Sequence, residues 1–319
     1  MKNIHIDGFS DERWHKILKG VDLKLYRGEI IGLIGESGAG KSTMGKAAMG
    51  YTQPGCKIIK GEVLFNGVDL TKLSEKEKRN VWGTKISYVA QSAAASFNPA
   101  HKLMEQTISA ANRAQINTTD LLRKDAVELY ESLQLPEPEK IGERFPHQVS
   151  GGQLQRIMTA MAMSPRPELI IFDEPTTALD VTTQVEVLSA MRSIVEKFNT
   201  AAIYITHDLA VVAQMADRIK VLRYGEEVEE ANTREMLSNP TEDYTKSLWS
   251  VRSLQKKENG NDDIVLELET ISASYGAVPV LFDVSIKLPR GRTVAVVGES
   301  GSGKSTAARV ITGLLPPVK

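Results

Sequence analysis

Short runs of apolar residues alternate along the chain with longer segments whose apolar positions recur at the period of a helix. The apolar runs predict strands at residues 29–35, 168–174, 201–207 and 218–225. The periodic segments predict helices at residues 41–50, 120–135, 151–163 and 182–199. Strands that are bounded by turn residues and followed by helices build a mainly parallel sheet, so the pattern predicts an α/β fold.

The segment at residues 61–70 departs from this alternation. It reads GEVLFNGVDL and carries Asn66-Gly67 between two short stretches of apolar and polar residues. Both turn residues accept the positive φ angles of a two-residue turn, so we expect a β-hairpin here.

One sequence pattern occurs twice in the chain. Residues 35–43 read GESGAGKST and residues 298–306 read GESGSGKST, at an offset of 298 − 35 = 263. The preceding segments, 20–34 and 283–297, match in the same register. We infer an internal repeat.

The repeat predicts the domain organisation. We expect a complete module at residues 1–249, a polar linker at 250–263 and the opening of a second module at 264–319. The second module would stop shortly after its first helix. Its partial sheet at 283–297 would lack flanking strands, which favours disorder or association through unpaired edges.

Composition excludes several classes of protein. The 41% of hydrophobic and 25% of charged residues rule out disorder, and 39 Lys plus Arg against 40 Asp plus Glu argue against nucleic-acid binding by bulk charge. Cys56 is the single cysteine, which excludes a disulfide framework or a multi-cysteine metal site and favours the cytosol. No apolar run approaches the roughly 20 residues that cross a bilayer. We expect a soluble protein whose contact with a membrane is peripheral.

The repeated pattern carries candidate chemistry. Gly35, Gly40, Lys41 and Ser42 satisfy G-x-x-x-x-G-K-[ST] between an apolar strand and a helix. The glycines let backbone N–H groups converge on phosphate oxygens, Lys41 reaches the β and γ phosphates, and Ser42 suits Mg²⁺. The strand, the helix and the second copy argue against a chance glycine-rich turn.

Two further segments become candidate functional segments because they follow this P-loop in the sequence. LIIFDEP at residues 169–175 places Asp173 and Glu174 at the carboxyl end of a strand, where Asp173 suits Mg²⁺ and Glu174 suits polarisation of water. VSGGQLQR at residues 149–156 opens a helix with Ser150. In isolation the first would be a solvated strand end and the second an ordinary serine N-cap.

The P-loop, SGGQ and DE segments, in this order and spacing, resemble the ATP-binding cassette (ABC) ATPases over essentially all of residues 1–250. The resemblance implies a P-loop NTPase core with a mainly parallel sheet, an amino-terminal antiparallel β portion and a helical subdomain at about 95–160. It also implies ATP and Mg²⁺ as cofactors.

The resemblance assigns roles to individual residues. It implies catalytic roles for Glu174, His207 (the switch histidine in ITHD) and Gln91 (the Q-loop glutamine), and Mg²⁺ contacts for Ser42, Gln91 and Asp173. In the first copy it implies nucleotide binding by Gly35, Glu36, Ser37, Gly38, Ala39, Gly40, Lys41, Ser42, Thr43, Ser150, Gly151, Gly152, Gln153 and Asp180. In the second copy the corresponding residues are Gly298, Glu299, Ser300, Gly301, Ser302, Gly303, Lys304, Ser305 and Thr306.

An aromatic residue of these ATPases stacks on adenine some two dozen residues before the P-loop. Tyr275 fits in the second copy, since 298 − 275 = 23. In the first copy Phe9 lies 26 residues and Trp14 lies 21 residues before Gly35. A short insertion, SDERWHK, would reconcile Phe9 with Tyr275, so we favour Phe9, although either ring also suits ordinary packing.

Several segments resemble one subfamily, the ATPases of oligopeptide, dipeptide and nickel importers. They are SFNPA (96–100), PHQVSGGQLQR (146–156), FDEPTTALDVTTQ (172–184), ITHDLAVVAQMADRI (205–219) and NPTEDYTKSL (239–248). QSAAASFNP replaces the more usual QDPMTSLNP, so we expect an altered contact with the permease, and the cysteines of some members' carboxyl-terminal extensions are absent.

This resemblance implies an ATPase subunit that powers peptide uptake from the cytoplasmic face of a bacterial inner membrane. Its implied partners are integral-membrane permeases, through them a periplasmic or extracellular solute-binding protein, and a second cassette from the same or another chain. ATP would be held between the P-loop of one cassette and the SGGQ segment of another. No nucleic-acid partner is implied.

Two other functions compete with this interpretation. A soluble tandem ABC protein acting on ribosomes would need a long charged helical linker, and one acting in DNA repair would need CxxC pairs; the sequence has neither. A regulatory nucleotide binder without catalysis is disfavoured by Glu174 and His207. Co-purification with permeases or with ribosomes discriminates the transporter from the soluble protein.

The two P-loops are predicted to be unequal, because only the first copy is followed by the catalytic segments. Lys41→Ala should eliminate ATPase activity, whereas Lys304→Ala should leave it nearly unchanged. ATPase activity should rise more than linearly with protein concentration, because the dimer that holds ATP between two cassettes pairs the first copies of two separate chains. Comparable losses from both lysine variants in one assay would contradict this prediction.

Overall fold

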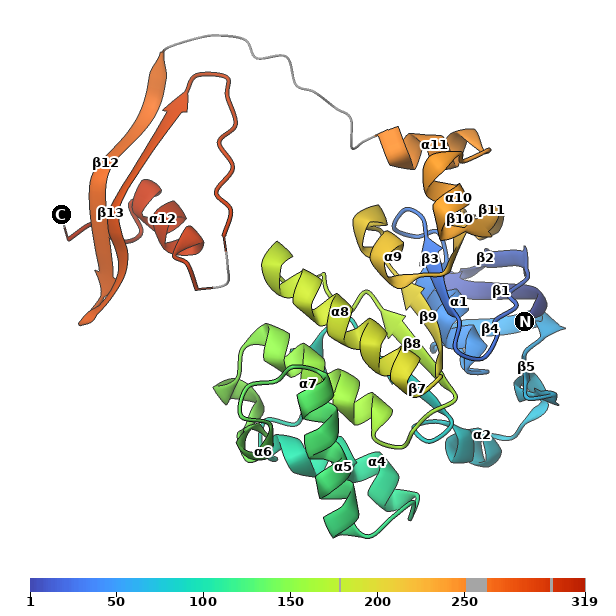
Figure 1. The fold of residues 1–319 in the computed structure, drawn as a ribbon. Helices are drawn as coiled ribbons and strands as arrows, with labels where there is room; N and C mark the ends of the chain where they lie inside the picture. The colour runs from blue at the N-terminus through green and yellow to red at the C-terminus, as the bar shows by residue number, and fades with distance from the viewer. Residues whose placement is uncertain (178, 251–262, 299–300, 319) are drawn as a thin grey trace. The chain divides into compact units, whose positions relative to one another are not determined.

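A computed structural model describes residues 1–177, 179–250, 263–298 and 301–318 (Figure 1). The chain divides into two units, one mainly within residues 1–250 and the other mainly within residues 263–318. Each unit is described by itself. The predicted linker falls largely on residues 251–262, outside the described residues.

A six-stranded sheet forms the centre of the first unit, in the order β11-β10-β3-β9-β8-β7. Its strands are β3 (Ile30–Ile34), β7 (Ile86–Val89), β8 (Leu169–Asp173), β9 (Ala201–Ile205), β10 (Arg218–Arg223) and β11 (Glu226–Asn232). All neighbouring pairs are parallel except β10 with β11. The predicted α/β class and all four predicted strands are confirmed, whereas β7 and β11 were not predicted.

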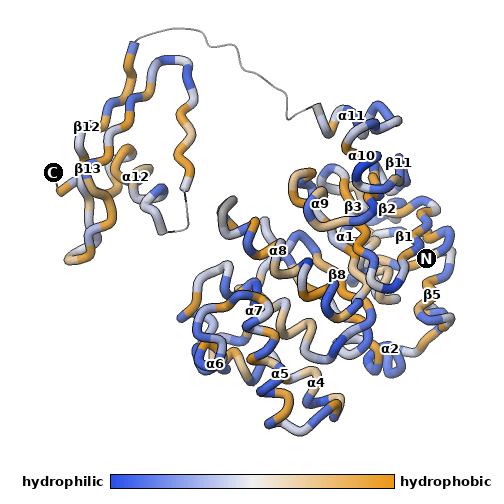
Figure 2. Tube along the Cα trace, viewed as in Figure 1, coloured by the Kyte–Doolittle hydropathy of each residue, from blue (hydrophilic) through white to orange (hydrophobic). Residues whose placement is uncertain are grey.

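Strands β3, β8 and β9 are buried along their whole length, which explains why they read as continuous apolar runs. Figure 2 shows the apolar character of β8 in the interior of the unit. Ile31 and Leu33 face one layer of the core, while Gly32 and Ile34 face the other. The sheet is therefore covered on both faces.

Helices on the two faces bury these side chains. They are α1 (Lys41–Ala48), which packs on β8 and β9, and α9 (Leu209–Met215), which packs on β3 and β9. Gly45 of α1 meets Ile171 and Ile205, and Gly32 of β3 meets Val212 of α9, so small residues allow a close approach on each face. The long helix α8 (Val181–Lys197) was predicted to within a few residues.

A group of helices lies beside β7, at the edge of the sheet (Figure 1). It consists of α3 (Ala93–Ser96), α4 (Leu103–Arg113), α5 (Thr119–Ser132), α6 (Pro138–Ile141) and α7 (Gly151–Met163). Helices α4 and α5 both pack on α7, and the buried hydroxyls of Thr107 and Tyr130 are 2.6 Å apart between α4 and α5. The helices predicted at 120–135 and 151–163 are confirmed.

An antiparallel portion precedes and flanks the P-loop helix. Strands β1 (Lys2–Ser10), β2 (Arg13–Val21) and β4 (Cys56–Glu62) form a sheet in the order β2-β1-β4. The hairpin of β5 (Leu64–Phe65) and β6 (Val68–Asp69) turns at Asn66 and Gly67, with φ of 50° and 82°. Both positive angles match the predicted two-residue turn, so this hairpin is confirmed.

Shorter elements complete the first unit. They are the 3₁₀ turns Leu70–Lys72 and Pro146–Gln148, and the helices α2 (Glu75–Val81), α10 (Thr233–Ser238) and α11 (Asp243–Ser250). Among the described residues, no helix combines the length and the apolar character that crossing a membrane requires.

The second unit contains the long hairpin β12 (Ile264–Tyr275) and β13 (Val278–Pro289), followed by α12 (Lys304–Ile311). Residues 293–297 correspond to β3 at the offset of 263 but do not form a strand. Val294, Val296 and Val297 are 44%, 48% and 86% exposed. This agrees with the expectation that the partial sheet lacks neighbours.

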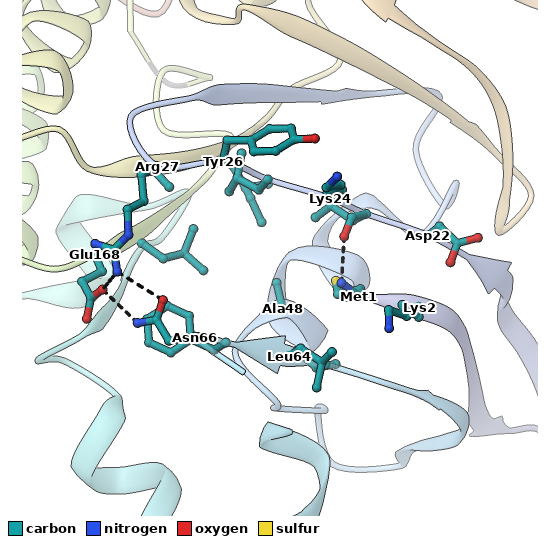
Figure 3. Close-up of a pocket in the computed structure, with 17 residues that line it drawn as sticks. Met1, Lys2, Asp22, Lys24, Tyr26, Arg27, Ala48, Leu64, Asn66 and Glu168 are labelled. Carbon is teal, nitrogen blue, oxygen red and sulfur yellow. Dashed lines mark hydrogen bonds and ion pairs between the residues drawn. The ribbon is translucent and has the colours of Figure 1, made fainter. Parts of the chain in front are cut away.

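A cavity of about 470 Å³ lies at the amino ends of β8 and β9, lined by Leu169 and Ala201 among others (Figure 3). One side is closed by a polar group in which the carboxylate of Glu168 accepts hydrogen bonds from Arg27 (2.8 Å) and Asn66 (2.9 Å). The P-loop follows the carboxyl end of β3, so this cavity and the P-loop occupy opposite edges of the sheet.

Candidate functional site

The P-loop connects β3 to α1, and its shape requires glycine. Gly35, Gly38 and Gly40 have φ of 149°, 84° and 97°, values that other L residues rarely adopt. A Cβ on Gly35 would lie 2.1 Å from the carbonyl oxygen of Leu222, and one on Gly40 would lie 2.7 Å from Leu18 Cδ2. The loop is therefore packed tightly from behind by β10 and β2.

Lys41 fills the interior of this loop. Its side chain is buried, and Nζ donates to the carbonyl oxygens of Gly35 (2.8 Å) and Glu36 (2.9 Å). Burial lowers the pKa of Lys41, and the nearby carboxylates of Glu174 and Asp173 oppose this effect. The amine thus bonds to two main-chain carbonyl oxygens of the loop, at the start of α1.

Ser42 and Asp173 face each other between α1 and the end of β8. Ser42 Oγ donates to Asp173 Oδ1 at 2.7 Å, and Asp173 is only 7% exposed. The hydroxyl of Tyr88 donates to Asp173 Oδ2. Burial and this hydrogen bond raise the pKa of the Tyr88 hydroxyl, which stays protonated and remains a donor. Oxygen ligands of this kind suit a hard cation.

Tyr88 was missed by sequence reasoning. It lies on β7, which pairs in parallel with β8, so that Tyr88 stands beside Ile171. The sequence around Tyr88, including the two residues between it and Gln91, carries no pattern that points to Asp173. Only the pairing of β7 with β8 brings the two side chains together.

Three predicted catalytic residues meet at the carboxyl ends of adjacent parallel strands. Gln91 follows β7, Glu174 follows β8 and His207 follows β9. Gln91 Nε2 donates to Glu174 Oε2 at 3.4 Å, and His207 Nδ1 lies 3.2 Å from Glu174 Oε1.

Glu174 has an unusual backbone conformation. Its φ of 49° is left-handed, although it is not glycine, and its N–H donates to the carbonyl oxygen of Ile205 at 3.0 Å. Such a conformation persists only where the surroundings impose it, and it is common at functional sites. The turn directs the carboxylate toward Gln91 and His207.

The predicted signature residues Ser150–Gln153 begin helix α7 and lie apart from this cluster. Ser150 Oγ accepts from the N–H of Gln153 at 3.2 Å, and Gln153 Oε1 accepts from the N–H of Ser150 at 3.0 Å. This is a capping box, and Gly151 is exposed. Within residues 1–177 and 179–250, no hydrogen bond joins Ser150–Gln153 to the P-loop.

Asp180 directly precedes helix α8. Its carboxylate accepts from the N–H of Thr183 at 3.0 Å and from the hydroxyl of Thr183 at 2.9 Å, at the start of α8. These contacts are those of a helix cap.

Phe9 and Trp14 form a single aromatic pair on the β1–β2 hairpin. Their ring centroids are 5.3 Å apart, and they are 52% and 47% exposed. Lys57 Nζ lies 3.7 Å from the centroid of the Trp14 ring. The two candidates for adenine stacking thus belong to one exposed surface.

Strand register locates the expected insertion. Gly8 pairs with His15 in the first hairpin, and Tyr275 pairs with Val278, the repeat equivalent of His15, in the second. Between the paired residues lie residues 9–14 in one hairpin and 276–277 in the other, a difference of 6 − 2 = 4 residues. Phe9 therefore directly follows the position equivalent to Tyr275.

The described residues of the second P-loop match those of the first in glycine φ angles and in one lysine contact. Gly298, Gly301 and Gly303 have φ of 152°, 85° and 93°, and Lys304 Nζ donates to the carbonyl oxygen of Gly298 at 2.8 Å. A Cβ on Gly303 would lie 2.6 Å from Leu281, the repeat equivalent of Leu18. The predicted site residues Glu299 and Ser300 lie outside the described residues.

Tyr275 also has local partners in the second unit. Its hydroxyl accepts from Arg309 at 2.9 Å. Hydrogen bonds from Thr306 and Arg309 lower the pKa of the Tyr275 hydroxyl.

Comparison with known proteins finds both sequence and structural similarity. The family model for ABC transporters matches residues 18–177 and 281–319. The chain is 42% identical over 229 residues to the oligopeptide transport ATP-binding protein OppD of Bacillus subtilis, covering 72% of this chain and 64% of that protein. It is 34% identical over 309 residues to the peptidoglycan transport ATP-binding protein YejF of Agrobacterium fabrum, covering 92% of this chain and 57% of that protein. The chain spans less than two thirds of the length of either relative.

A solved structure of similar fold is a dimer of the ATP-binding cassette MJ0796 in a post-hydrolysis state, bound to ADP and Pi. It matches with a TM-score of 0.65 and 28% identity, over 73% of this chain and 97% of that chain. The P-loop NTPase class expected from the sequence is confirmed by this match.

The close approach of Gly35 to Leu222 predicts unequal effects of two alanine substitutions. Gly38→Ala should cost about 1–2 kcal/mol, because its Cβ meets nothing within 4 Å and only the left-handed φ is unfavourable. Gly35→Ala should cost about 3 kcal/mol or more, since the new methyl group also overlaps a backbone carbonyl. Urea unfolding followed by tryptophan fluorescence reports on the first unit, because Trp14, Trp82 and Trp249 all lie there. Equal losses in the two variants would contradict the packing argument.

Proposed function

Because this chain belongs to the ABC transporter family, we propose that it is the ATP-hydrolysing subunit of an importer for peptides or related solutes. The observation that carries the proposal is the meeting of Gln91, Glu174 and His207 next to a P-loop lysine and the Ser42–Asp173 pair. The names of relatives that act in oligopeptide and dipeptide transport support the class of solute.

The phosphate groups of ATP would be bound by the P-loop. The N–H groups at the start of α1 are directed at anions, and the helix dipole adds to this preference. Lys41 would exchange its bonds to the Gly35 and Glu36 carbonyls for bonds to the β and γ phosphates. Phe9 would stack on adenine, as part of the exposed Phe9–Trp14 pair.

Ser42 and Asp173 fit Mg²⁺. Among the described residues, no group of three or more His, Cys, Asp or Glu side chains is placed to hold a metal by itself. Mg²⁺ does not need such a cage, since it binds through one or two protein oxygens together with phosphate and water. The bound ion would neutralise phosphate charge. Gln91 donates to the carboxylate of Glu174, so its side chain would lie near the ion.

Glu174 would orient and polarise the attacking water. Its carboxylate is held by Gln91 and His207 and stands beside the Asp173 position that would contact the metal. His207, which is 57% exposed at its side chain, would contact the γ phosphate after ATP binds. Both side chains project from the same sheet edge as the P-loop, so water and phosphate would meet there.

A complete site would need a second cassette. Helix α7 begins with an exposed Gly151 and makes no hydrogen bond to its own P-loop within the described residues, yet its amino terminus suits an anion. Ser150, Gly151, Gly152 and Gln153 would therefore face the ATP of the opposite cassette, with Asp180 near the dimer seam. The dimeric MJ0796 structure supports this arrangement.

Closure of the cassettes around ATP would drive attached permease subunits, and hydrolysis would reopen them, a population shift that follows from different nucleotide affinities of the two states. The chain would act at the cytoplasmic face of the membrane, with a solute-binding protein as an indirect partner. The match to the Agrobacterium protein extends over 309 residues, which supports a shared tandem organisation with residues 264–319 as part of a second cassette.

Glu174→Gln should preserve ATP binding and reduce steady turnover at least about 100-fold, because the amide keeps the size of the side chain but cannot accept a proton. The variant should accumulate as a nucleotide-bound closed complex. Turnover and nucleotide affinity are measured in parallel. Glu168→Gln is the matched control, since Glu168 precedes the same strand at its opposite end. Near wild-type turnover by Glu174→Gln would refute the assigned role.

Gly151→Asp should leave ATP binding by the single chain intact and collapse hydrolysis, because a carboxylate would repel the γ phosphate of the opposite cassette. An acidic residue in the first turn of α7 favours the helix dipole, so folding should not suffer. Gly151→Asn separates the effect of size from that of charge and should be less damaging. If nucleotide binding and turnover fell in parallel, the role of this segment in trans would be wrong.

A further inference from the structure

Helix α11 contacts the P-loop directly, although the two are far apart in the sequence. The N–H of Glu36 donates to the hydroxyl oxygen of Tyr244 at 3.2 Å. The segment around Tyr244 resembles the carboxyl-terminal extension of peptide-importer ATPases, but neither the sequence nor the resemblance linked it to the nucleotide site.

The peptide unit between Gly35 and Glu36 is held from both of its sides. Its carbonyl oxygen, on Gly35, accepts from Lys41 Nζ at 2.8 Å, while its N–H, on Glu36, donates to Tyr244. In a trans peptide these two groups point in opposite directions, so Lys41 and Tyr244 lie on opposite sides of one plane. Rotation of this peptide would break both bonds.

Tyr244 is itself firmly placed. The guanidinium carbon of Arg223 lies 4.4 Å from the centre of its ring, and Arg223 ends the strand β10 that backs the P-loop. The start of α11 is fixed by the carboxylate of Glu229 on β11, which accepts from the N–H groups of Thr241 (2.8 Å) and Glu242 (3.1 Å). Tyr244 is thus anchored by its ring to β10, which packs behind the loop, and through the start of α11 to β11.

We propose that Tyr244 is a positioning residue that fixes the Gly35–Glu36 peptide and thereby keeps the P-loop in its nucleotide-binding shape. The proposal rests on the proposed function of this loop. When Lys41 turns to phosphate, the Gly35 carbonyl loses a donor, and the Tyr244 bond remains to hold the peptide plane. Tyr244 contacts neither Glu174 nor His207, so its effect falls on nucleotide affinity and not on the chemical step.

The chain offers a matched control for this proposal. Tyr224 also lies beside Arg223, with 5.1 Å between the guanidinium carbon and the ring centre, but it is 65% exposed. Tyr244→Phe removes the acceptor for Glu36 and keeps the ring on Arg223. Tyr224→Phe removes a hydroxyl from a second ring that lies near the same arginine.

The first experiment compares the two variants in the full chain, using a fluorescent ATP analogue for affinity and steady-state hydrolysis for KM and kcat. Loss of one hydrogen bond predicts that Tyr244→Phe raises the dissociation constant and KM about three- to tenfold, with kcat nearly unchanged. Tyr224→Phe should change either constant by about twofold at most. A fall in kcat at constant KM, or equal effects of both variants, would overturn the proposal.

The second experiment needs no nucleotide. Hydrogen exchange of the Glu36 amide should accelerate in Tyr244→Phe and stay at the wild-type rate in Tyr224→Phe, with the melting temperature of both close to wild type. Unchanged exchange at Glu36, or a general loss of fold in Tyr244→Phe, would overturn the positioning role. If the wild-type chain binds the analogue normally and Tyr244→Phe does too, this inference alone fails. If the wild-type chain binds no nucleotide, the proposed function fails, and this inference with it.

Discussion

The close packing of the P-loop against the end of β10 is the constraint on which the candidate site depends. Gly35 approaches the Leu222 carbonyl so closely that no side chain fits between them, and the N–H of Gly225 donates to the carbonyl of Ala39 at 3.2 Å. The loop therefore has a rigid rear wall. Lys41 lies inside the loop because the carbonyls of Gly35 and Glu36 point inward, and Ser42, in the first turn of α1, consequently lies within reach of Asp173.

The parallel sheet supplies the second half of the site. Adjacent parallel strands end at the same edge, so Gln91, Glu174 and His207 meet although they are far apart in the sequence. The left-handed conformation of Glu174 directs its carboxylate into this group. Polar groups that are already oriented need little rearrangement when charge develops, which is the physical basis of electrostatic catalysis.

The parts of the structure that could be predicted are those that local sequence determines. Buried strands read as apolar runs, and the Asn66-Gly67 turn follows from two residues that accept positive φ. Tyr88 and Tyr244 could not be found in this way, because each acts through strand pairing or helix docking that brings distant segments together. The same limit leaves Phe9 and Trp14 as alternatives, because the hairpin register places Gly8, the neighbour of Phe9, at the position equivalent to Tyr275.

The two copies of the repeat show which structural features recur in a short segment and which require the whole sheet. Both P-loops have nearly equal glycine φ angles at the described positions, and in both the lysine bonds to the first glycine's carbonyl, so this part of the loop geometry recurs in the second unit. The strand that precedes the loop, in contrast, forms only where neighbouring strands are present. Residues 30–34 form β3 between β9 and β10, whereas residues 293–297 form no strand, and residues 263–298 and 301–318 contain no equivalent of β9 or β10. Since Asp173, Glu174 and His207 come from neighbouring strands, the residues predicted to act in hydrolysis meet only where the sheet is assembled, as in the first unit.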